Sequence, residues 1–175
     1  MQLRKTAPDP TITLRRADGT VWALRAVGRK FSPPHDVAHV VVERGLGLRR
    51  GFIGTIAAGG LFPQMQHLGG RLQSHGVAKS KALLKVNAKT LSEAEVVTAA
   101  FQQAMLAADP EYLASIRART QHCPHRPGNG AIEAIWQDLS ALRDRWDAMA
   151  LEESLTLDWP EPADWRRLRG STICP

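Results

Sequence analysis

Cysteine is scarce in this sequence, whose 175 residues include only Cys123 and Cys174. Two cysteines cannot build the disulfide framework of a small secreted protein, so we expect a reduced, cytoplasmic setting. The chain also lacks any run of about 18 uncharged apolar residues, so no membrane-spanning helix and no membrane partner are expected. The basic start, MQLRKTAPDP, has no apolar stretch behind it and does not read as a secretory signal.

Motifs of several large enzyme classes are missing as well. No glycine-rich G-x-G-x-x-G or P-loop pattern follows a strand, so a phosphate-cradling nucleotide site is not indicated. No G-x-S-x-G is present, which removes the usual nucleophile of a serine hydrolase. The hydrophobic content of 43% is typical of a soluble globular protein, and the length fits a single domain over residues 1–175.

A small antiparallel sheet is predicted from the two ends of the chain. Residues 1–10 read as a flexible start, and residues 11–27 form a β-hairpin around the turn Ala17-Asp18-Gly19. Leu155-Thr156-Leu157-Asp158-Trp159 alternates like a strand and stops at Pro160, so it could join the hairpin as a third strand. Residues 161–175 are predicted to form a tail.

Helices are expected between these strands, which together give an α+β fold with a small sheet packed against several helices. Pro33 and Pro34 open a helix at 33–44, which Gly45 and Gly47 end. Ser92-Glu93-Ala94-Glu95 has the pattern of a capping box and predicts a helix start at Ser92. Further segments are predicted as a short buried helix at 51–62, an irregular connection at 63–76, a basic helix at 77–89, and helices at 92–108, 110–120 and 130–151.

The segment 130–151 is the clearest helix in the sequence. Its apolar residues recur in steps of three and four and form one stripe, namely Ile132, Ile135, Leu139, Leu142, Trp146 and Met149. We expect this stripe to pack on the core of its own chain, and a homodimer seam is the alternative.

The chemistry of interest lies at the start of the helix at 33–44. His35, His39 and Glu43 are spaced by four residues, so at about 100° per residue they point from one stripe of the helix. Two imidazoles one turn apart can bind a single divalent ion, for which zinc is the first candidate. Glu43 lies about 12 Å along the axis from His35 and would support His39 or, after bending, serve as third ligand.

The pattern His35-Asp36-Val37-Ala38-His39 resembles the H-E-x-x-H helix of the zincin metallopeptidases. In that family the two histidines hold zinc and the carboxylate after the first histidine is the general base. The resemblance therefore implies His35 and His39 as ligands and Asp36 as the catalytic base, although aspartate is one methylene shorter. It implies a zinc-dependent hydrolase of peptide or amide bonds, acting on a peptide or small molecule.

No third ligand can be assigned by motif. The candidates are His67, His75, His122, Cys123 and His125, of which the last three share one short loop. A longer stretch, from Pro33 to Phe52 together with 155–160, resembles a group of small bacterial proteins without an assigned function. That second resemblance covers most of the chain and implies no activity.

Two other interpretations stay open. The apolar residues around His35, His39 and Glu43 predict a buried helix, whose polar side chains could form a structural network without metal. The net charge of +6 and the spacing of Lys81, Lys85 and Lys89 suggest a non-catalytic, basic, helical protein that binds a protein partner or nucleic acid. No zinc-finger or aromatic RNA-binding motif accompanies these lysines, which argues against nucleic acid.

Overall fold

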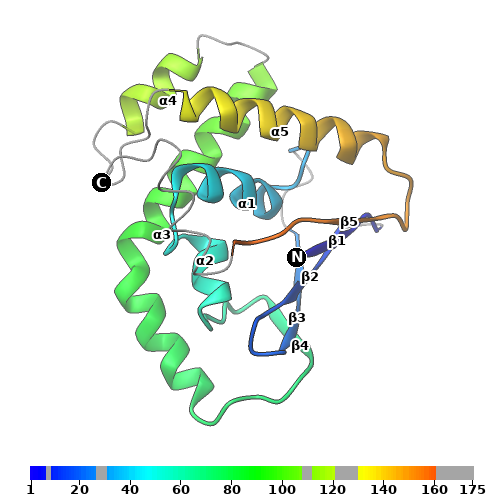
Figure 1. Ribbon diagram of the computed structural model, residues 1–175, viewed down its shortest axis with the longest axis vertical. Helices are drawn as coiled ribbons and strands as arrows, with labels where there is room; N and C mark the ends of the chain where they lie inside the picture. Colours follow the sequence, from blue (N-terminus) through cyan, green and yellow to red (C-terminus); the bar gives the residue numbers. More distant parts are fainter. Residues whose placement is uncertain (7–8, 27–30, 108–111, 121–129, 161–175) are drawn as a thin grey trace.

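The structure is a computed structural model that describes residues 1–6, 9–26, 31–107, 112–120 and 130–160 (Figure 1). Within these ranges a five-stranded antiparallel sheet stands beside five helices, which confirms the predicted α+β fold. Figure 1 shows the helices α1 (His35–Leu46) and α2 (Phe52–Ala57) between the sheet and the long helix α3 (Gly76–Ala107). Among the described helices, none combines the length and hydrophobicity needed to cross a bilayer.

The sheet contains the predicted hairpin and two strands that the sequence did not indicate. The hairpin consists of β2 (Thr11–Arg15) and β3 (Val21–Arg25), and the late strand is β5 (Ser154–Thr156), shorter than expected. β5 does not join the hairpin directly, because β1 (Gln2–Arg4) lies between them in the order β4-β3-β2-β1-β5. The prediction of a flexible start was therefore wrong for β1, whose Leu3 pairs with Ile12 and Leu155.

The second unexpected strand is β4 (Met65–Gly69), which lies in the segment predicted to be irregular. It pairs antiparallel with β3 and forms the edge of the sheet. The glycines and the proline of segment 63–76 had indicated a loop. In the structure, Gly69 and Gly70 allow the strand to end close to the hairpin turn. A Cβ on Gly70, whose φ is +81°, would lie 2.5 Å from the carbonyl oxygen of Gly19.

One face of the sheet is apolar and packs on the helices. Side chains on one side of the strands are buried, as expected for an antiparallel sheet with one solvated face, and they are Leu3, Ile12, Leu14, Trp22, Leu24 and Leu155. These residues share one hydrophobic cluster with side chains of α1, α2, α3, α4 (Tyr112–Thr120) and α5 (Ala131–Ala148). The described elements are thus organised around a common core.

Helix α3 corrects the prediction of two separate helices. It runs without interruption for 32 residues, so Ser92 and Glu95 lie in its interior and form no capping box. Its buried stripe includes Ser80, Asn87, Ala94 and Phe101, which follow one another at intervals of seven residues. Because the first half of this stripe is polar, the apolar periodicity in the sequence begins only near Ala94.

Helices α1 and α5 pack closely against each other. The predicted stripe on α5 is buried at Ile132, Ile135, Leu139, Leu142 and Trp146, which confirms that it packs on the core of its own chain. Gly45 does not end α1 as predicted, because the helix continues to Leu46 and is capped by Gly47. Gly45 instead permits the contact with α5, since a Cβ there would lie 2.3 Å from Cγ1 of Ile135.

Candidate metal centre

One stripe of α1 carries the polar side chains of His35, His39 and Glu43 among buried apolar residues. α1 begins at His35 after Pro34, and its valines 37, 40, 41 and 42 are buried in the core. His39 and Glu43, one turn apart, have no exposed surface. Burying a polar side chain without hydrogen-bond partners costs free energy, so these two residues are expected to have partners, and the partners indicate the kind of site.

Two imidazoles and one carboxylate converge beside α1. Nε2 of His35 and Nε2 of His39 lie 3.2 Å apart, and their rings meet at an interplanar angle of 86°. Glu95, from the middle of α3, places Oε2 at 3.1 Å from Nε2 of His35 and Oε1 at 3.4 Å from Nε2 of His39. Among the described residues, these three form the group whose ligand atoms are close enough to hold one metal ion.

The second nitrogen of each ring is engaged by another side chain. His35 Nδ1 donates to Oε1 of Gln102 at 2.5 Å, and the amide nitrogen of Gln102 donates to the carbonyl oxygen of Pro33 at 2.9 Å. That second bond fixes which end of the Gln102 amide faces His35, because a carbonyl oxygen only accepts. His39 Nδ1 donates to Oε1 of Glu43 at 2.9 Å. In their neutral forms both rings therefore carry the lone pair on Nε2.

Glu43 connects the candidate centre to α2. Its carboxylate accepts hydrogen bonds from the backbone amides of Phe52, Ile53 and Gly54, at 2.6–3.3 Å. These amides are free because the first turn of a helix leaves its N–H groups without intrahelical partners. Gly51 makes the approach possible, since a Cβ there would lie 2.4 Å from Cδ of Glu43. Glu43 thus holds His39 in place and anchors α2 with the same carboxylate.

The electrostatics of the group favour a positive charge at its centre. Burial alone would lower the pKa of His39, but hydrogen bonds with Glu43 and Glu95 and the charges of these residues outweigh it and raise the pKa to about 9. When Nε2 of a ring carries a proton it donates to Glu95, and such hydrogen bonds from His35 and His39 hold the pKa of the Glu95 carboxyl well below its usual value. Burial raises the pKa of Glu43, against the hydrogen bonds from His39 and from the amides of Gly54 and Phe52.

The structure brings together two of the three predicted metal ligands. His35 and His39 face each other as the four-residue spacing indicated. Glu43 contacts Nδ1 of His39, the ring nitrogen that does not face His35, and it is not in the converging group, so its role as third ligand or as support for His39 stays a prediction. Glu95 occupies the third position in that group. Glu95 is not among the ligands predicted from the sequence, although Glu95, Thr98 and Gln102 form a polar strip at helical spacing on α3.

The other proposed residues lie elsewhere or outside the described ranges. Asp36 is half-buried next to His35 on α1 and is not among the three converging residues, so its role as base stays a prediction. His67 lies on β4, where its ring meets that of Trp22 at 5.0 Å, and His75 lies in the connection before α3. His122, Cys123 and His125, like the predicted tail at 161–175, fall outside the described residues.

The arrangement has the ligand set and the access that a metal ion requires. Two histidine nitrogens and a carboxylate point at a common position, and the Glu95 side chain is 52% exposed, so the group opens to solvent on that side. No known protein family, no curated protein and no solved structure matches the chain. The case for a function therefore rests on the geometry and charge of this site.

Proposed function

We propose that this protein binds a divalent metal ion, zinc, through Nε2 of His35, Nε2 of His39 and the carboxylate of Glu95. The observation that carries the proposal is the 3.2 Å separation of two Nε2 atoms that both face one carboxylate. Two ligand atoms bound to one tetrahedral zinc ion at its usual bond lengths lie about 3.3 Å apart. The two imidazole nitrogens, 3.2 Å apart, match this spacing, and Glu95 places one carboxylate oxygen at 3.1 Å from His35 and the other at 3.4 Å from His39.

The surroundings of the two rings support the same interpretation. Metal-binding histidines usually donate their second ring N–H to a carboxylate or carbonyl oxygen, which orients the ring and fixes its tautomer. His39 does so to Glu43 and His35 to the side-chain carbonyl of Gln102. Both lone pairs then face each other at 3.2 Å, which is unfavourable unless a proton or a metal ion lies between them.

The charges at the site are compatible with a bound cation. The carboxyl of Glu95, whose pKa is held low, supplies a negative charge beside the two rings. A divalent cation between the two Nε2 atoms would replace the proton that the raised pKa of His39 favours there and would face this carboxylate. Nitrogen and oxygen donors in a tetrahedral arrangement are the set that zinc prefers.

The same site has the features of a hydrolase, which we propose as its activity on peptide or amide bonds. Zinc held by two histidines and one glutamate, with a further position open, supplies Lewis acidity and lowers the pKa of water. The opening beside Glu95 gives such access. Asp36 stands at the position of the general base in the H-E-x-x-H pattern, one residue after His35.

Metal analysis of the full chain, purified without a tag, tests the binding step. We expect one zinc per chain by mass spectrometry, and loss of at least nine-tenths of it in His35→Ala, His39→Ala and Glu95→Gln. Two matched controls, His75→Ala and Glu93→Gln, remove the same residue types outside the group and should keep the metal. Equal metal content in all five variants, or none in the parent chain after incubation with zinc, would leave only a structural polar network.

Hydrolysis is tested separately from binding. A mixed library of peptides and small amides is incubated with the zinc-loaded chain, and cleavage is followed by mass spectrometry. We expect Asp36→Asn to keep one zinc per chain but to lose cleavage by at least about 100-fold, the usual contribution of a general base. Full metal content without cleavage of any substrate would restrict the function to metal binding.

A further inference from the structure

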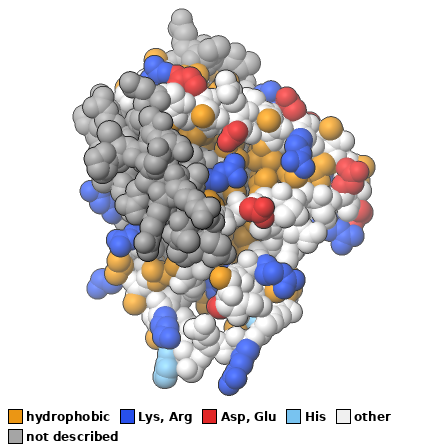
Figure 2. Space-filling model, viewed as in Figure 1, with side chains coloured by type: hydrophobic (Ala, Val, Ile, Leu, Met, Phe, Trp, Pro, Cys, Tyr) orange, Lys and Arg blue, Asp and Glu red, His pale blue; other side chains and the backbone are white. Residues whose placement is uncertain are grey.

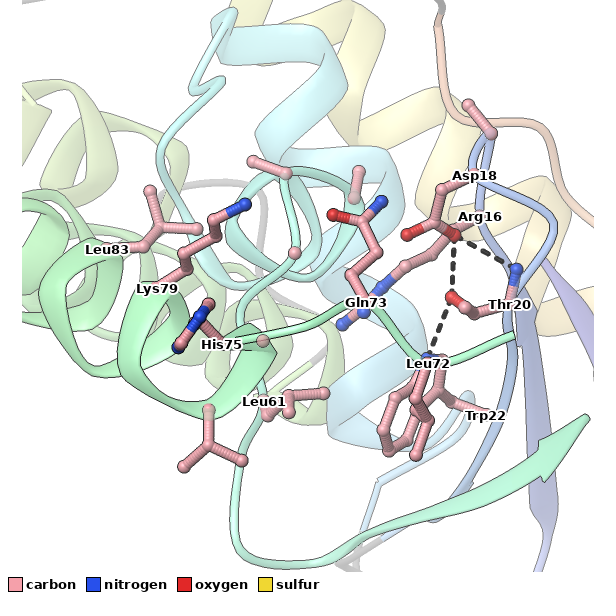
Figure 3. Close-up of a pocket in the computed structure, with 16 residues that line it drawn as sticks. Arg16, Asp18, Thr20, Trp22, Leu61, Leu72, Gln73, His75, Lys79 and Leu83 are labelled. Atoms are coloured by element: carbon pink, nitrogen blue, oxygen red, sulfur yellow. Dashed lines mark hydrogen bonds between the residues drawn. The ribbon is translucent and has the colours of Figure 1, made fainter. Parts of the chain in front are cut away.

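A second candidate site lies at the N-terminal end of α3, away from the candidate metal centre. A cavity of about 680 Å³ opens between the β2–β3 turn, the end of α2, the connection from β4 and the first turns of α3 (Figure 3). This volume is within the range of small-molecule sites. The side chains that matter for its chemistry are Arg16, Trp22, Leu61, Leu72, Lys79 and Leu83.

Trp22 forms a fixed aromatic wall of the cavity. Its indole Nε1 donates to Oγ1 of Thr20 at 3.0 Å, and that hydroxyl donates to Oδ1 of Asp18 at 2.6 Å (Figure 3). The backbone amide of Thr20 donates to the same carboxylate oxygen at 2.9 Å. The ring orientation is therefore set before any ligand arrives, and Asp18 is already engaged by Thr20.

Arg16 brings an incompletely paired cation to the same place. Its side chain reaches from the hairpin into the cavity (Figure 3), where Nη2 donates to the carbonyl oxygen of Gly60. The guanidinium carbon lies 5.1 Å from the centroid of the Trp22 ring. Nε is shielded from solvent without an acceptor. The negative charge of Asp18 acts on Arg16, but among the described residues no carboxylate lies within ion-pair distance of the guanidinium. A half-buried guanidinium with one hydrogen bond would gain from an anionic partner.

The rest of the lining combines a second cation with apolar surface. Lys79, on the first turn of α3, also lines the cavity and has no ion-pair partner among the described residues. Leu61, Leu72 and Leu83 supply aliphatic surface, and Leu72 remains 57% exposed. Figure 2 shows lysine and arginine side chains and a histidine at this lower end of the molecule, where acidic side chains are few.

We propose that this cavity binds a small organic carboxylate whose apolar or planar skeleton packs against Trp22. Arg16 and Lys79 supply the positive charge that attracts the carboxylate, and the skeleton contacts the indole ring and the three leucines. Charge-assisted hydrogen bonds from a guanidinium fit a carboxylate well, and a largely apolar lining favours the remainder of such a ligand. The cations exclude an amine, and the apolar wall disfavours a bare ion.

This site is separate from the candidate metal centre. Lys79 and Glu95 belong to the same helix, about 24 Å apart along its axis at the usual rise per residue. Binding at the cavity should therefore not need zinc, and the experiment is done on chelator-treated protein so that a carboxylate cannot bind through the metal. Failure of one proposal then leaves the other standing.

The test uses three probes of graded chemistry in calorimetric titrations. 2-Naphthoate carries the carboxylate and a planar skeleton, 2-naphthalenemethanol carries the skeleton without charge, and acetate carries the charge alone. We expect 2-naphthoate to bind with a stoichiometry of one, the alcohol to bind at least about tenfold more weakly, and acetate to give no saturable heat. Equal affinities of naphthoate and alcohol, or no binding of naphthoate, would overturn the proposal.

Variants assign the binding to this cavity. Arg16→Met and Lys79→Met keep the aliphatic stems, and each should weaken naphthoate about 10- to 100-fold. Lys81→Met removes an exposed lysine two residues away that does not line the cavity, and it should leave the affinity unchanged. Lys79 is exposed, so its variant stays informative even if Arg16→Met fails to fold. An effect of Lys81→Met equal to that of Lys79→Met would place the anion elsewhere.

Discussion

The two candidate sites of this molecule have opposite electrostatic deficits. Beside α1, two glutamates contact two imidazoles, and the pKa of His39 rises to about 9 because hydrogen bonds with Glu43 and Glu95 and the charges of these residues outweigh the effect of burial. Beside the hairpin, Arg16 and Lys79 line a cavity whose single carboxylate, that of Asp18, already accepts hydrogen bonds from Thr20. The first site lacks a cation and the second lacks an anion, so we expect the two sites to bind ligands of opposite charge.

The sites also differ in how firmly they are held. Each ring of the candidate metal centre is fixed by a side chain that itself has a second partner, Glu43 through α2 and Gln102 through Pro33. In the cavity only Trp22 has such a chain of hydrogen bonds, and Arg16 keeps one. Rigid support suits a metal ion, which requires ligand atoms at fixed distances, whereas a looser site can adapt to an organic ligand.

The largest effect on stability is expected at Glu43, whose carboxylate contacts both the ring of His39 and the backbone amides of α2. Glu43→Gln turns an N–H group toward backbone amides that already donate, so the free energy of unfolding should fall by about 3–5 kcal/mol. Urea unfolding measures this change. The matched variant Glu152→Gln breaks an exposed ion pair with Arg4 and should cost less than about 1 kcal/mol. Similar losses in both variants would show that Glu43 is not an anchor of the fold.

A smaller effect on metal affinity is expected at Gln102. Gln102→Leu removes the acceptor for His35 Nδ1 and should weaken zinc binding about 10- to 100-fold, as usual for groups that orient a ligand. Competition with a chromophoric chelator gives the affinity. Gln103→Leu is the natural control because Gln103 is the exposed neighbour on the same helix. An unchanged zinc affinity in Gln102→Leu would mean that His35 needs no orienting partner.

The raised pKa of His39 makes the first site dependent on pH. Because this pKa is about 9 in the folded chain and 6.5 for an unperturbed histidine, the metal-free protein gains stability that is complete below about pH 6.5. That contribution is lost as the pH rises through about 9. Zinc must displace the proton, so its affinity should increase about tenfold per pH unit between pH 7 and 9. Chelator competition at three pH values within this range measures the slope, and a flat response would contradict a proton on His39.

The smallest effect separates the second site from the first. Thr20→Val leaves the indole N–H of Trp22 without its acceptor and should cost about 1 kcal/mol of unfolding free energy. Naphthoate binding should weaken, because the aromatic wall is no longer fixed, while zinc affinity stays the same. A parallel loss of zinc binding in this variant would show that the two sites are coupled.

Prediction from the sequence succeeded where one local pattern was sufficient. The turn Ala17-Asp18-Gly19 indicated the hairpin, and the stripe on α5 indicated a helix that packs inside its own chain. It failed at β1, which has three residues and exists only because β2 and β5 flank it. It failed again at Ser92, where a local capping pattern lies in a helix that continues on both sides.

Helix α3 was predicted as two helices because the buried residues of its first half are polar. Ser80 and Asn87 are buried because they have partners on α2 and in the connection after it, where Asn87 donates to Thr55 at 2.9 Å and Ser80 accepts from the amide of Leu61. In the sequence such residues resemble a solvated surface. Only the position of α2 makes them part of the core.

The order of residues along the chain was enough to place His35 and His39 on one helical stripe, because the geometry of an α-helix fixes the direction of residues four apart. It was also enough to place a carboxylate, Glu43, one turn further. Packing in three dimensions was needed to turn Glu43 away from the other ring and to bring Glu95 into the group. The reason is that the third residue belongs to another helix, and contacts between helices depend on packing that no local pattern encodes.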